Sequence, residues 1–250
     1  MTEERWSAFV GKVRGRFDQV AEETRQGCMA LLVQCDDDPG AMTNAFTAME
    51  RRLMGLESKV QDTFDERVAP EVGGSLFDRL DAIGRQAVAT MERDRERLRI
   101  DVYAAAARRI WQRARAEQVD QVVCPQCSAA VPVPETFQSI HVRCGHCDGL
   151  VTFEPGSRLR AVQGYVVHPL AQEAAWDAWV AKEAAQNRLD GARGEPRALV
   201  EALEAAEIGY WRAYLTARAR MMPNLARDLD KDLEGKMRQF YVRYGRIIGR

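Results

Sequence analysis

Histidine is scarce in this sequence, which has 3 histidines in 250 residues, at His141, His146 and His168. A carboxylate di-iron site in a helical bundle needs a Glu-x-x-His pair on each of two helices, and three histidines in one short section cannot supply these pairs. The motifs G-x-x-x-x-G-K-[ST], G-x-S-x-G and H-E-x-x-H are also absent. Their absence excludes the phosphate-binding loop, the α/β-hydrolase nucleophile and the zinc-protease helix as sources of activity.

The sequence also lacks a long apolar run and an excess of charge of one sign. No uncharged apolar stretch approaches the roughly 18 residues that a membrane-spanning helix needs. The first five residues are acidic and no apolar segment follows them, so we expect no secretory signal. With 36 Lys and Arg against 37 Asp and Glu, the formal net charge of −1 gives no general attraction to nucleic acid or acidic lipid. We therefore expect a cytoplasmic protein.

Prolines are few, 9 in all, and they leave long stretches free to form helix. Thr2 is suited to cap a first helix that ends near Cys35, before the turn-forming residues 36–40. A heptad-like apolar seam follows over residues 42–64, and helical periodicity returns over residues 76–118. The apolar stripe of the first helix, whose members lie mostly three or four positions apart, comprises Trp6, Phe9, Val13, Phe17, Val20, Cys28 and Leu31.

Helical patterns resume after a section rich in Val, Gly and Pro. Pro169 and Pro196 are suited to the first turns of helices, and the helix begun by Pro169 should stop near Asp190. Pro223 either kinks the next helix or starts a new one. Five aromatic residues in this region are more typical of a helical core or interface than of a ligand groove: Trp176, Trp179, Tyr210, Trp211 and Tyr214.

Together these patterns predict a mainly α protein of long antiparallel helices, in a bundle or coiled-coil-like arrangement, with a small internal β zinc ribbon. We expect three helices in residues 1–119, the ribbon in residues 120–167 with strands at 121–123, 139–142 and 150–153, and C-terminal helices in residues 168–250 that pack with the first region. The sequence leaves open whether the helices form one bundle or two. Their apolar stripes exceed what one slender bundle covers, so we expect a homo-oligomer.

Four of the 6 cysteines form two C-x-x-C pairs, Cys124–Cys127 and Cys144–Cys147, with sixteen residues between the pairs. In a reducing compartment this arrangement favours a metal over disulfides. Two residues between paired cysteines allow one tight turn to direct both sulfurs at a single ion, and two such turns complete a tetrahedral site. The spacing therefore predicts one structural Zn²⁺ on Cys124, Cys127, Cys144 and Cys147.

The segments around these cysteines resemble the short bacterial zinc-ribbon family. The resemblance lies in Val123-Cys124-Pro125-Gln126-Cys127, the Val-Pro repeat of residues 131–134, Val142-Arg143-Cys144-Gly145-His146-Cys147 and the apolar residues 151–153. It covers about residues 121–154 and leaves the helical remainder unrecognised. It implies that the four cysteines are the ligands and that this section folds as a ribbon, but it implies no activity, because the family is diverse in function.

A site of four thiolates has no open position for water, so it should be structural rather than catalytic. His141 and His146 are alternative ligands, although we favour their assignment as surface residues. Nucleic-acid binding needs clustered cations with stacking aromatics, and Arg143 is the only Lys or Arg between Asp120 and Pro155. We therefore expect the ribbon to contact protein.

Two further groups have alternative interpretations. Cys28 and Cys35 lie seven residues apart and are either a redox or metal pair or, as we favour, small buried apolar residues. The C-terminal segment is basic and amphipathic, which is typical of a core-packed helix with an Arg-rich outer face or of a segment that binds a membrane or phosphates. Its candidate contact residues are Lys236, Arg238, Arg243, Arg246 and Arg250.

These observations favour a non-enzymatic helical scaffold or adaptor that acts through contacts with unidentified protein partners. The first alternative is a nucleic-acid-associated protein that uses the ribbon and the Arg-rich C-terminal helix. The second is an enzyme with an unrecognised helical active site. No catalytic residue stands out, since the acidic pairs on the helices look like solvated surface.

Overall fold

The computed structural model describes residues 1–134 and 136–250. The described chain is mainly helical, with two small antiparallel sheets of two strands each, as the sequence predicts. It divides into two compact units, residues 1–106 and residues 107–250.

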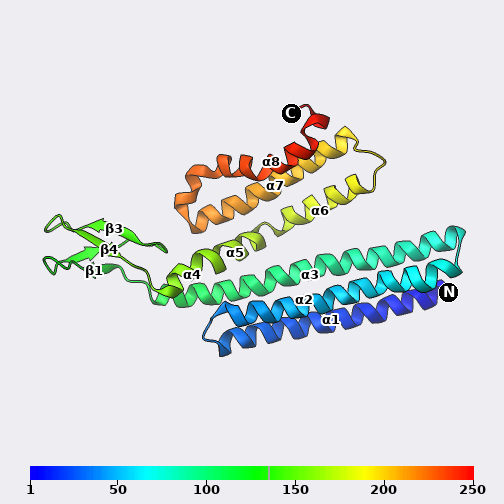
Figure 1. Cartoon of the computed structure of the whole chain (residues 1–250), viewed down its shortest axis with the longest axis horizontal. Helices are drawn as coiled ribbons and strands as arrows, with labels where there is room; N and C mark the ends of the chain where they lie inside the picture. The colour runs from blue at the N-terminus through cyan, green and yellow to red at the C-terminus, as the bar shows by residue number, and fades with distance from the viewer. Residues whose placement is uncertain (135) are drawn as a thin grey trace. The chain divides into compact units, whose positions relative to one another are not determined.

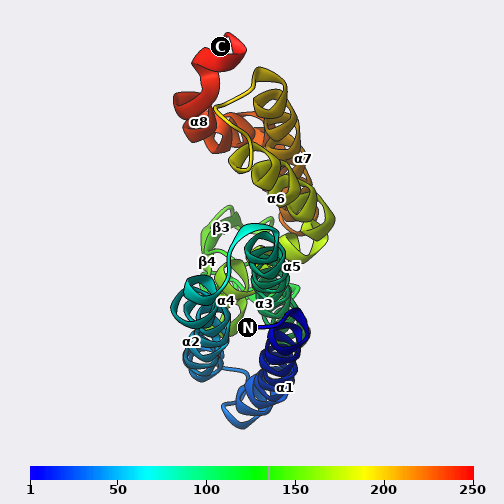
Figure 2. The same ribbon diagram turned by 90° about the vertical axis from the view of Figure 1, so that its right-hand side faces the viewer.

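The first unit is built from α1 (Glu3–Gln34), α2 (Pro39–Thr63) and most of α3 (Gly74–Ala116). Figure 1 shows these helices side by side, and the end-on view of Figure 2 places them at the corners of a triangle. The side chain of Thr2 accepts a hydrogen bond from the N–H of Arg5, as expected for the cap of α1. Asp38 caps α2 in the same way, by accepting from the N–H of Gly40 at 2.9 Å.

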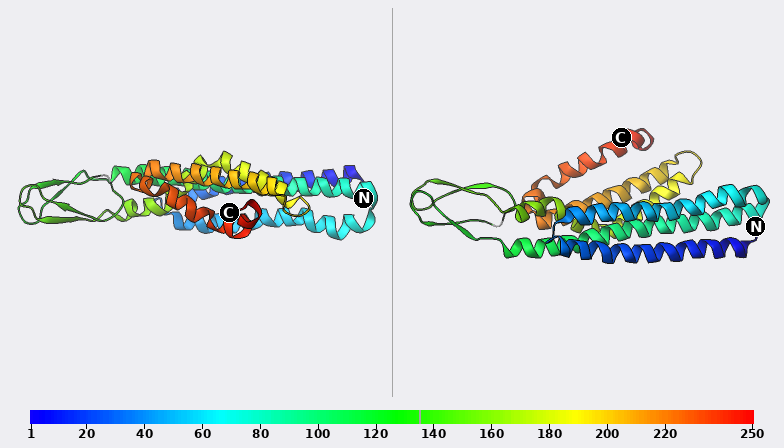
Figure 3. Two further views of the ribbon diagram at one scale, coloured as in Figure 1. Left: turned by 90° about the horizontal axis from the view of Figure 1, so that it is seen from above. Right: turned by 60° about the horizontal axis from the view of Figure 1, so that its bottom comes forward.

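The connections between these helices are short. Asp36 and Asp37, in the α1–α2 turn, have φ angles of 52° and 66°, a left-handed conformation that Asp tolerates better than most residues. Between α2 and α3 the chain passes through a π-helical turn, η1 (Phe64–Val68), and a 3₁₀ turn, η2 (Ala69–Glu71). Both connections reverse the chain, so successive helices run antiparallel along one another (Figure 3).

One continuous apolar core joins the three helices. The indole N–H of Trp6, in α1, donates to the carbonyl oxygen of Leu80, in α3, at 2.8 Å. At Gly84 a Cβ atom would lie 3.2 Å from the Trp6 ring, so the glycine allows α3 to approach closely. The fully buried side chains include Trp6, Phe17, Leu32, Phe46, Leu53, Leu80 and Met91. In α1 the buried leucine is Leu32 and not the predicted Leu31, which is partly buried.

The second unit begins with the end of α3 and continues into two hairpins. Strand β1 (Gln121–Val123) pairs with β2 (Ala130–Pro132), and β3 (Ile140–Arg143) pairs with β4 (Leu150–Phe153). The sequence patterns indicate β1, β3 and β4, but not the short strand β2. The hairpins share a small core of Val131, Val151 and the cysteine side chains of residues 124 and 144.

Five further helices are described in this unit: α4 (Ser157–Tyr165), α5 (Val167–Ala174), α6 (Trp176–Asp190), α7 (Arg197–Met221) and α8 (Leu229–Ile248), with a 3₁₀ turn η3 (Pro223–Asp228) before α8. Helix α4 corrects the expectation that the β section extends to residue 167. Its Leu159 and Val162, with Val166 just after it, pack against Ala107, Ile110 and Ala114 of α3. The helix of Pro169 starts two residues earlier than expected, at Val167.

Helix α7 is the central element of the C-terminal helices, because it packs against α5, α6 and α8. Its Tyr210 and Tyr214 are buried, and Trp179 and Trp211 are partly buried against the same cluster, so four of the five predicted aromatic residues belong to a core. Helix α7 ends at Met221, and Met222 is not helical. Pro223 then starts the turn η3, so it begins a new segment and does not kink α7. Within the described part of the chain, every helix is too short or too polar to pass through a lipid bilayer.

Candidate metal centre

The two C-x-x-C pairs form turns of the same geometry. In the first, the N–H of Cys124 donates to the carbonyl oxygen of Ala129, and the N–H of Ser128 donates to that of Cys124, both at 2.9 Å. In the second, the N–H of Cys144 donates to Gly149 at 2.8 Å, and the N–H of Asp148 donates to Cys144 at 2.9 Å. The residue after each pair has a φ angle of 59°. Each hairpin therefore presents its two sulfurs in the same way.

The four cysteine sulfurs converge on one point between the hairpins. The Sγ atoms of Cys124 and Cys147 lie 3.7 Å apart, and so do those of Cys127 and Cys144. All four sulfurs lie within 4.8 Å of one another. Among residues 1–134 and 136–250, this is the one place where three or more His, Cys, Asp or Glu side chains bring their ligand atoms together in this way. The four predicted ligands thus form a site that can hold a single metal ion.

The backbone of each turn prepares its first cysteine to be a thiolate. The N–H groups of Cys127 and Gln126 donate to the Cys124 sulfur and lower its pKa from 9.0 to about 7. The N–H groups of His146 and Cys147 lower the pKa of Cys144 in the same way. The N–H of Gly149 also favours the Cys147 thiolate, but the crowded sulfurs, that of Cys127 foremost, raise the pKa of Cys147 to about 12. A bound cation would remove this mutual repulsion.

The neighbouring histidines do not join the four sulfurs. The Nδ1 atom of His141 lies 3.0 Å from the hydroxyl oxygen of Thr152, a pair across β3 and β4, and the side chain is exposed. His146 lies in the second turn and is also exposed. Neither is among the converging ligands. The expectation that both are surface residues of the ribbon agrees with these positions.

Sequence reasoning missed a contact between the two turns. The side-chain oxygen of Gln126, from the first turn, lies 3.7 Å from the sulfur of Cys147, in the second. A Cβ atom on Gly149 would lie 2.4 Å from that oxygen and 3.3 Å from the Cys147 sulfur. Gly149 therefore leaves room for Gln126 to cross between the hairpins. The only sign of this contact in the sequence is a glycine two positions after the second C-x-x-C pair.

Two large apolar side chains of the ribbon, close in sequence to the cysteine pairs, are exposed. Val123, which precedes the first ligand, is 69% exposed, and Leu150, three residues after the last ligand, is 63% exposed. Both are among the most exposed large apolar side chains of the described chain. Arg143 remains the only cation of this section of the sequence.

The predicted contact residues of the C-terminal segment lie on α8 and just beyond it. The apolar side of α8 is directed inward, with Met237, Tyr244 and Ile248 buried. Lys236 lies over the ring of Trp211, at 4.7 Å from its centroid. Arg250 donates to the hydroxyl of Tyr241 and pairs with Glu204 at 3.3 Å. The remaining basic residues, Arg238, Arg243 and Arg246, are exposed.

Cys28 and Cys35 differ in environment. Cys28 is 2% exposed in the core of the first unit, and burial raises the pKa of its thiol. Cys35 is half-buried at the C-terminal cap of α1. Both are free thiols, and the preferred interpretation as small apolar residues fits Cys28 best.

Comparisons with known proteins found no relative of this chain. No family model matches the chain, and neither the curated proteins nor the solved structures contain a match.

Proposed function

We propose that this protein is a non-enzymatic helical scaffold whose ribbon is held by one structural Zn²⁺ and contacts a protein partner. The sulfur geometry supports zinc. A tetrahedral Zn²⁺ with Zn–S bonds of about 2.3 Å separates its sulfurs by about 3.8 Å. The Cys124–Cys147 and Cys127–Cys144 sulfur separations, both 3.7 Å, match that edge length. The resemblance of residues 121–154 to short bacterial zinc ribbons supports the same metal.

The donor set favours a structural role. Zinc with four thiolate ligands has no position left for water or substrate, whereas catalytic zinc keeps one open. The two hairpins belong to separate sheets. Because an isolated two-stranded hairpin is marginally stable, the ion would supply much of the bonding that joins them.

The observation that carries the protein-binding proposal is the exposure of Val123 and Leu150 beside the metal centre. Apolar side chains this exposed on a small rigid module are suited to burial against another protein. Nucleic acid would instead require clustered cations, and the ribbon section has Arg143 alone. The zinc turns would then fix the shape of this surface.

Native mass spectrometry of the purified chain, before and after a strong chelator, tests the metal and the assembly. We expect one zinc per chain, in a dimer or larger assembly, with no bound nucleic acid. Loss of the assembly on chelation would place the ribbon at the interface. A chain purified without metal would overturn the zinc proposal, and co-purified nucleic acid with salt-sensitive binding would favour the nucleic-acid alternative.

Crosslinking in cells tests the contact surface. The double variant V123S/L150S should keep its zinc but lose the partner that the unmodified chain captures specifically. Val242, in α8, is 83% exposed and provides a matched control, so V242S should keep the partner. Equal recovery of the partner with the unmodified chain, V123S/L150S and V242S would show that the ribbon surface is not the contact.

A further inference from the structure

The second unit contains a cavity that neither the four cysteines nor the scaffold role uses. Its volume is about 740 Å³, within the roughly 300–1,000 Å³ typical of small-molecule sites. Its wall combines the end of α3, the segment between β2 and β3, the junction of α4 and α5, and the end of α7.

Most of the cavity wall is apolar. Val166, Val167 and Met222 are buried, and Leu170 and Met221 extend the same surface. The aromatic part of the wall is a pair formed by Trp111 and Phe137, whose ring centroids lie 5.2 Å apart. Such a lining favours a hydrocarbon chain, because transfer of apolar surface from water is the main gain on binding.

Two arginines, Arg115 and Arg220, also line this cavity. The guanidinium of Arg115 lies over the ring of Trp111, at 5.9 Å from the centroid. Neither Asp nor Glu is among the described lining residues, and within the described residues neither arginine forms an ion pair with a carboxylate. Both arginine side chains are exposed. The cavity therefore combines a hydrocarbon-like wall with two solvent-exposed cations that have no acidic partner among the described residues.

We propose that this cavity binds a single-chain anionic amphiphile, a fatty-acid carboxylate, with its chain against the apolar wall and its head group at Arg115 and Arg220. A neutral hydrocarbon would gain nothing from the two guanidinium groups, which are exposed to water at this cavity. A free inorganic anion would leave the wall exposed to water. A carboxylate can pair with either guanidinium through two parallel hydrogen bonds. The proposal does not depend on the scaffold role.

Isothermal titration calorimetry of the full, zinc-loaded chain tests the chemistry of the ligand. The probes are decanoate, laurate and myristate, each below its micelle-forming concentration. Each added methylene should raise the association constant by about fourfold while the chain still fits the cavity. Dodecanol should bind at least about tenfold more weakly than laurate, and dodecyltrimethylammonium should not bind.

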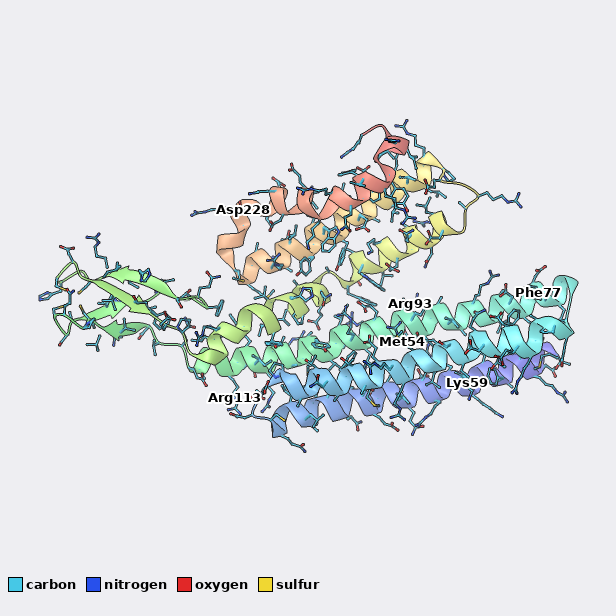
Figure 4. All side chains as sticks on the ribbon, viewed as in Figure 1. Met54, Lys59, Phe77, Arg93, Arg113 and Asp228 are labelled. Carbon is cyan, nitrogen blue, oxygen red and sulfur yellow. The ribbon has the colours of Figure 1, made fainter. Side chains whose placement is uncertain are left out.

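Two matched double variants test the position of the site. R115Q/R220Q removes the cavity cations, which lie in the last turns of α3 and α7. R113Q/R218Q removes the same charge from the same two turns, at residues that do not line the cavity; Figure 4 labels Arg113. We expect at least about tenfold weaker laurate binding in the first variant and unchanged binding in the second.

A third variant, L170W, should weaken laurate and dodecanol alike by filling the cavity. Several results would overturn the proposal: no binding of any carboxylate, equal binding of the ammonium amphiphile, equal loss in both arginine variants, or binding of an acidic peptide such as hexaglutamate in place of laurate. Circular dichroism and zinc content, measured on each variant, separate loss of the ligand from loss of the fold.

Discussion

At the scale of single residues, the metal centre depends on side chains other than its ligands. Gln126 and Gly149 are the clearest case, because the amide oxygen of one occupies the space where a Cβ on the other would lie. The sequence alone predicts the four ligands, since C-x-x-C spacing is a local property. It does not predict the Gln126–Gly149 contact, because that pair depends on how the two hairpins face one another.

The substitution G149A should therefore weaken metal binding even though it changes no ligand. A Cβ at 2.4 Å from the Gln126 oxygen forces that side chain away and crowds the Cys147 sulfur. The Gln126 amide is the end of a flexible side chain and can move aside, so the main effect is the crowding of the Cys147 sulfur, and we expect about two- to tenfold weaker zinc affinity. Competition with a coloured chelator measures it. G145A is the control, because its Cβ would meet no atom within 4 Å.

Metal retention should also depend on pH. The pKa of Cys124 in the metal-free fold is about 7, below the 9.0 of an ordinary cysteine. This thiolate therefore stabilises the fold fully at pH values above 9.0, and its contribution is lost as the pH falls through about 7. Protons also compete with the metal ion for the thiolates, which weakens metal binding as the pH falls. Zinc affinity should fall between pH 8 and pH 6. The variant C28S should behave identically, and a pH-independent affinity would contradict the assigned ligands.

At the scale of elements, long helices are the most predictable part of this chain. Helices α1, α2 and α3 repeat a period of three to four residues over many turns, so the core side chains follow from spacing. Helix α4 is short and its capping position is Gly156, without a side-chain hydrogen bond. Its one valine, Val162, and the two that follow it, Val166 and Val167, are more typical of a strand. Strand β2 has three residues and ends in Pro132. Helix α4 forms because it packs against α3, which is distant in sequence, whereas β2 forms by pairing with the neighbouring strand β1 in a hairpin.

Helices α2 and α3 are also joined by a buried ion pair that the periodicity does not reveal. Arg95 donates to Glu57 at 2.8 Å and pairs with Glu50 at 3.4 Å. Glu57 is 6% exposed, so its carboxylate has little contact with water. The pair fixes how the two helices align, because either charge alone would be buried without compensation.

The substitution E57Q should lower the free energy of unfolding by about 1–3 kcal/mol, because it weakens the hydrogen bond that a buried guanidinium relies on. Urea denaturation measures the change. E66Q alters an exposed glutamate in η1 and should leave stability within about 0.5 kcal/mol of the unmodified chain. A double-mutant cycle of E57L and R95L should give a coupling above about 0.5 kcal/mol, and additive effects would show that the pair is not coupled.

At the scale of the whole molecule, the ribbon and the helical parts have different sources of stability. The first unit has a continuous apolar core and contains none of the four converging cysteines. The ribbon of the second unit has a few buried valines and the sulfurs themselves. Metal should therefore matter to the ribbon and not to the apolar cores of the helices.

Chelation should remove the structure of the ribbon while most of the helical signal remains. Far-ultraviolet circular dichroism at 222 nm should change little on adding a chelator, whereas proteolysis within residues 120–154 should become fast. The core of the first unit should stay protected from hydrogen exchange, since its burial does not involve the ion. Collapse of the whole helical signal on chelation would show instead that the first unit depends on the metal.

The similarity of the two cysteine turns has a further consequence. Each hairpin carries half of the ligands, and no strand of one pairs with a strand of the other. If the chain were cut between β2 and β3, the two pieces would still be complementary halves of one coordination sphere. Their affinity for each other should rise when zinc is added and fall back, when it is withdrawn, to what the packing of α4 on α3 supplies. The ion would thus act as a reversible crosslink between two parts of the same polypeptide.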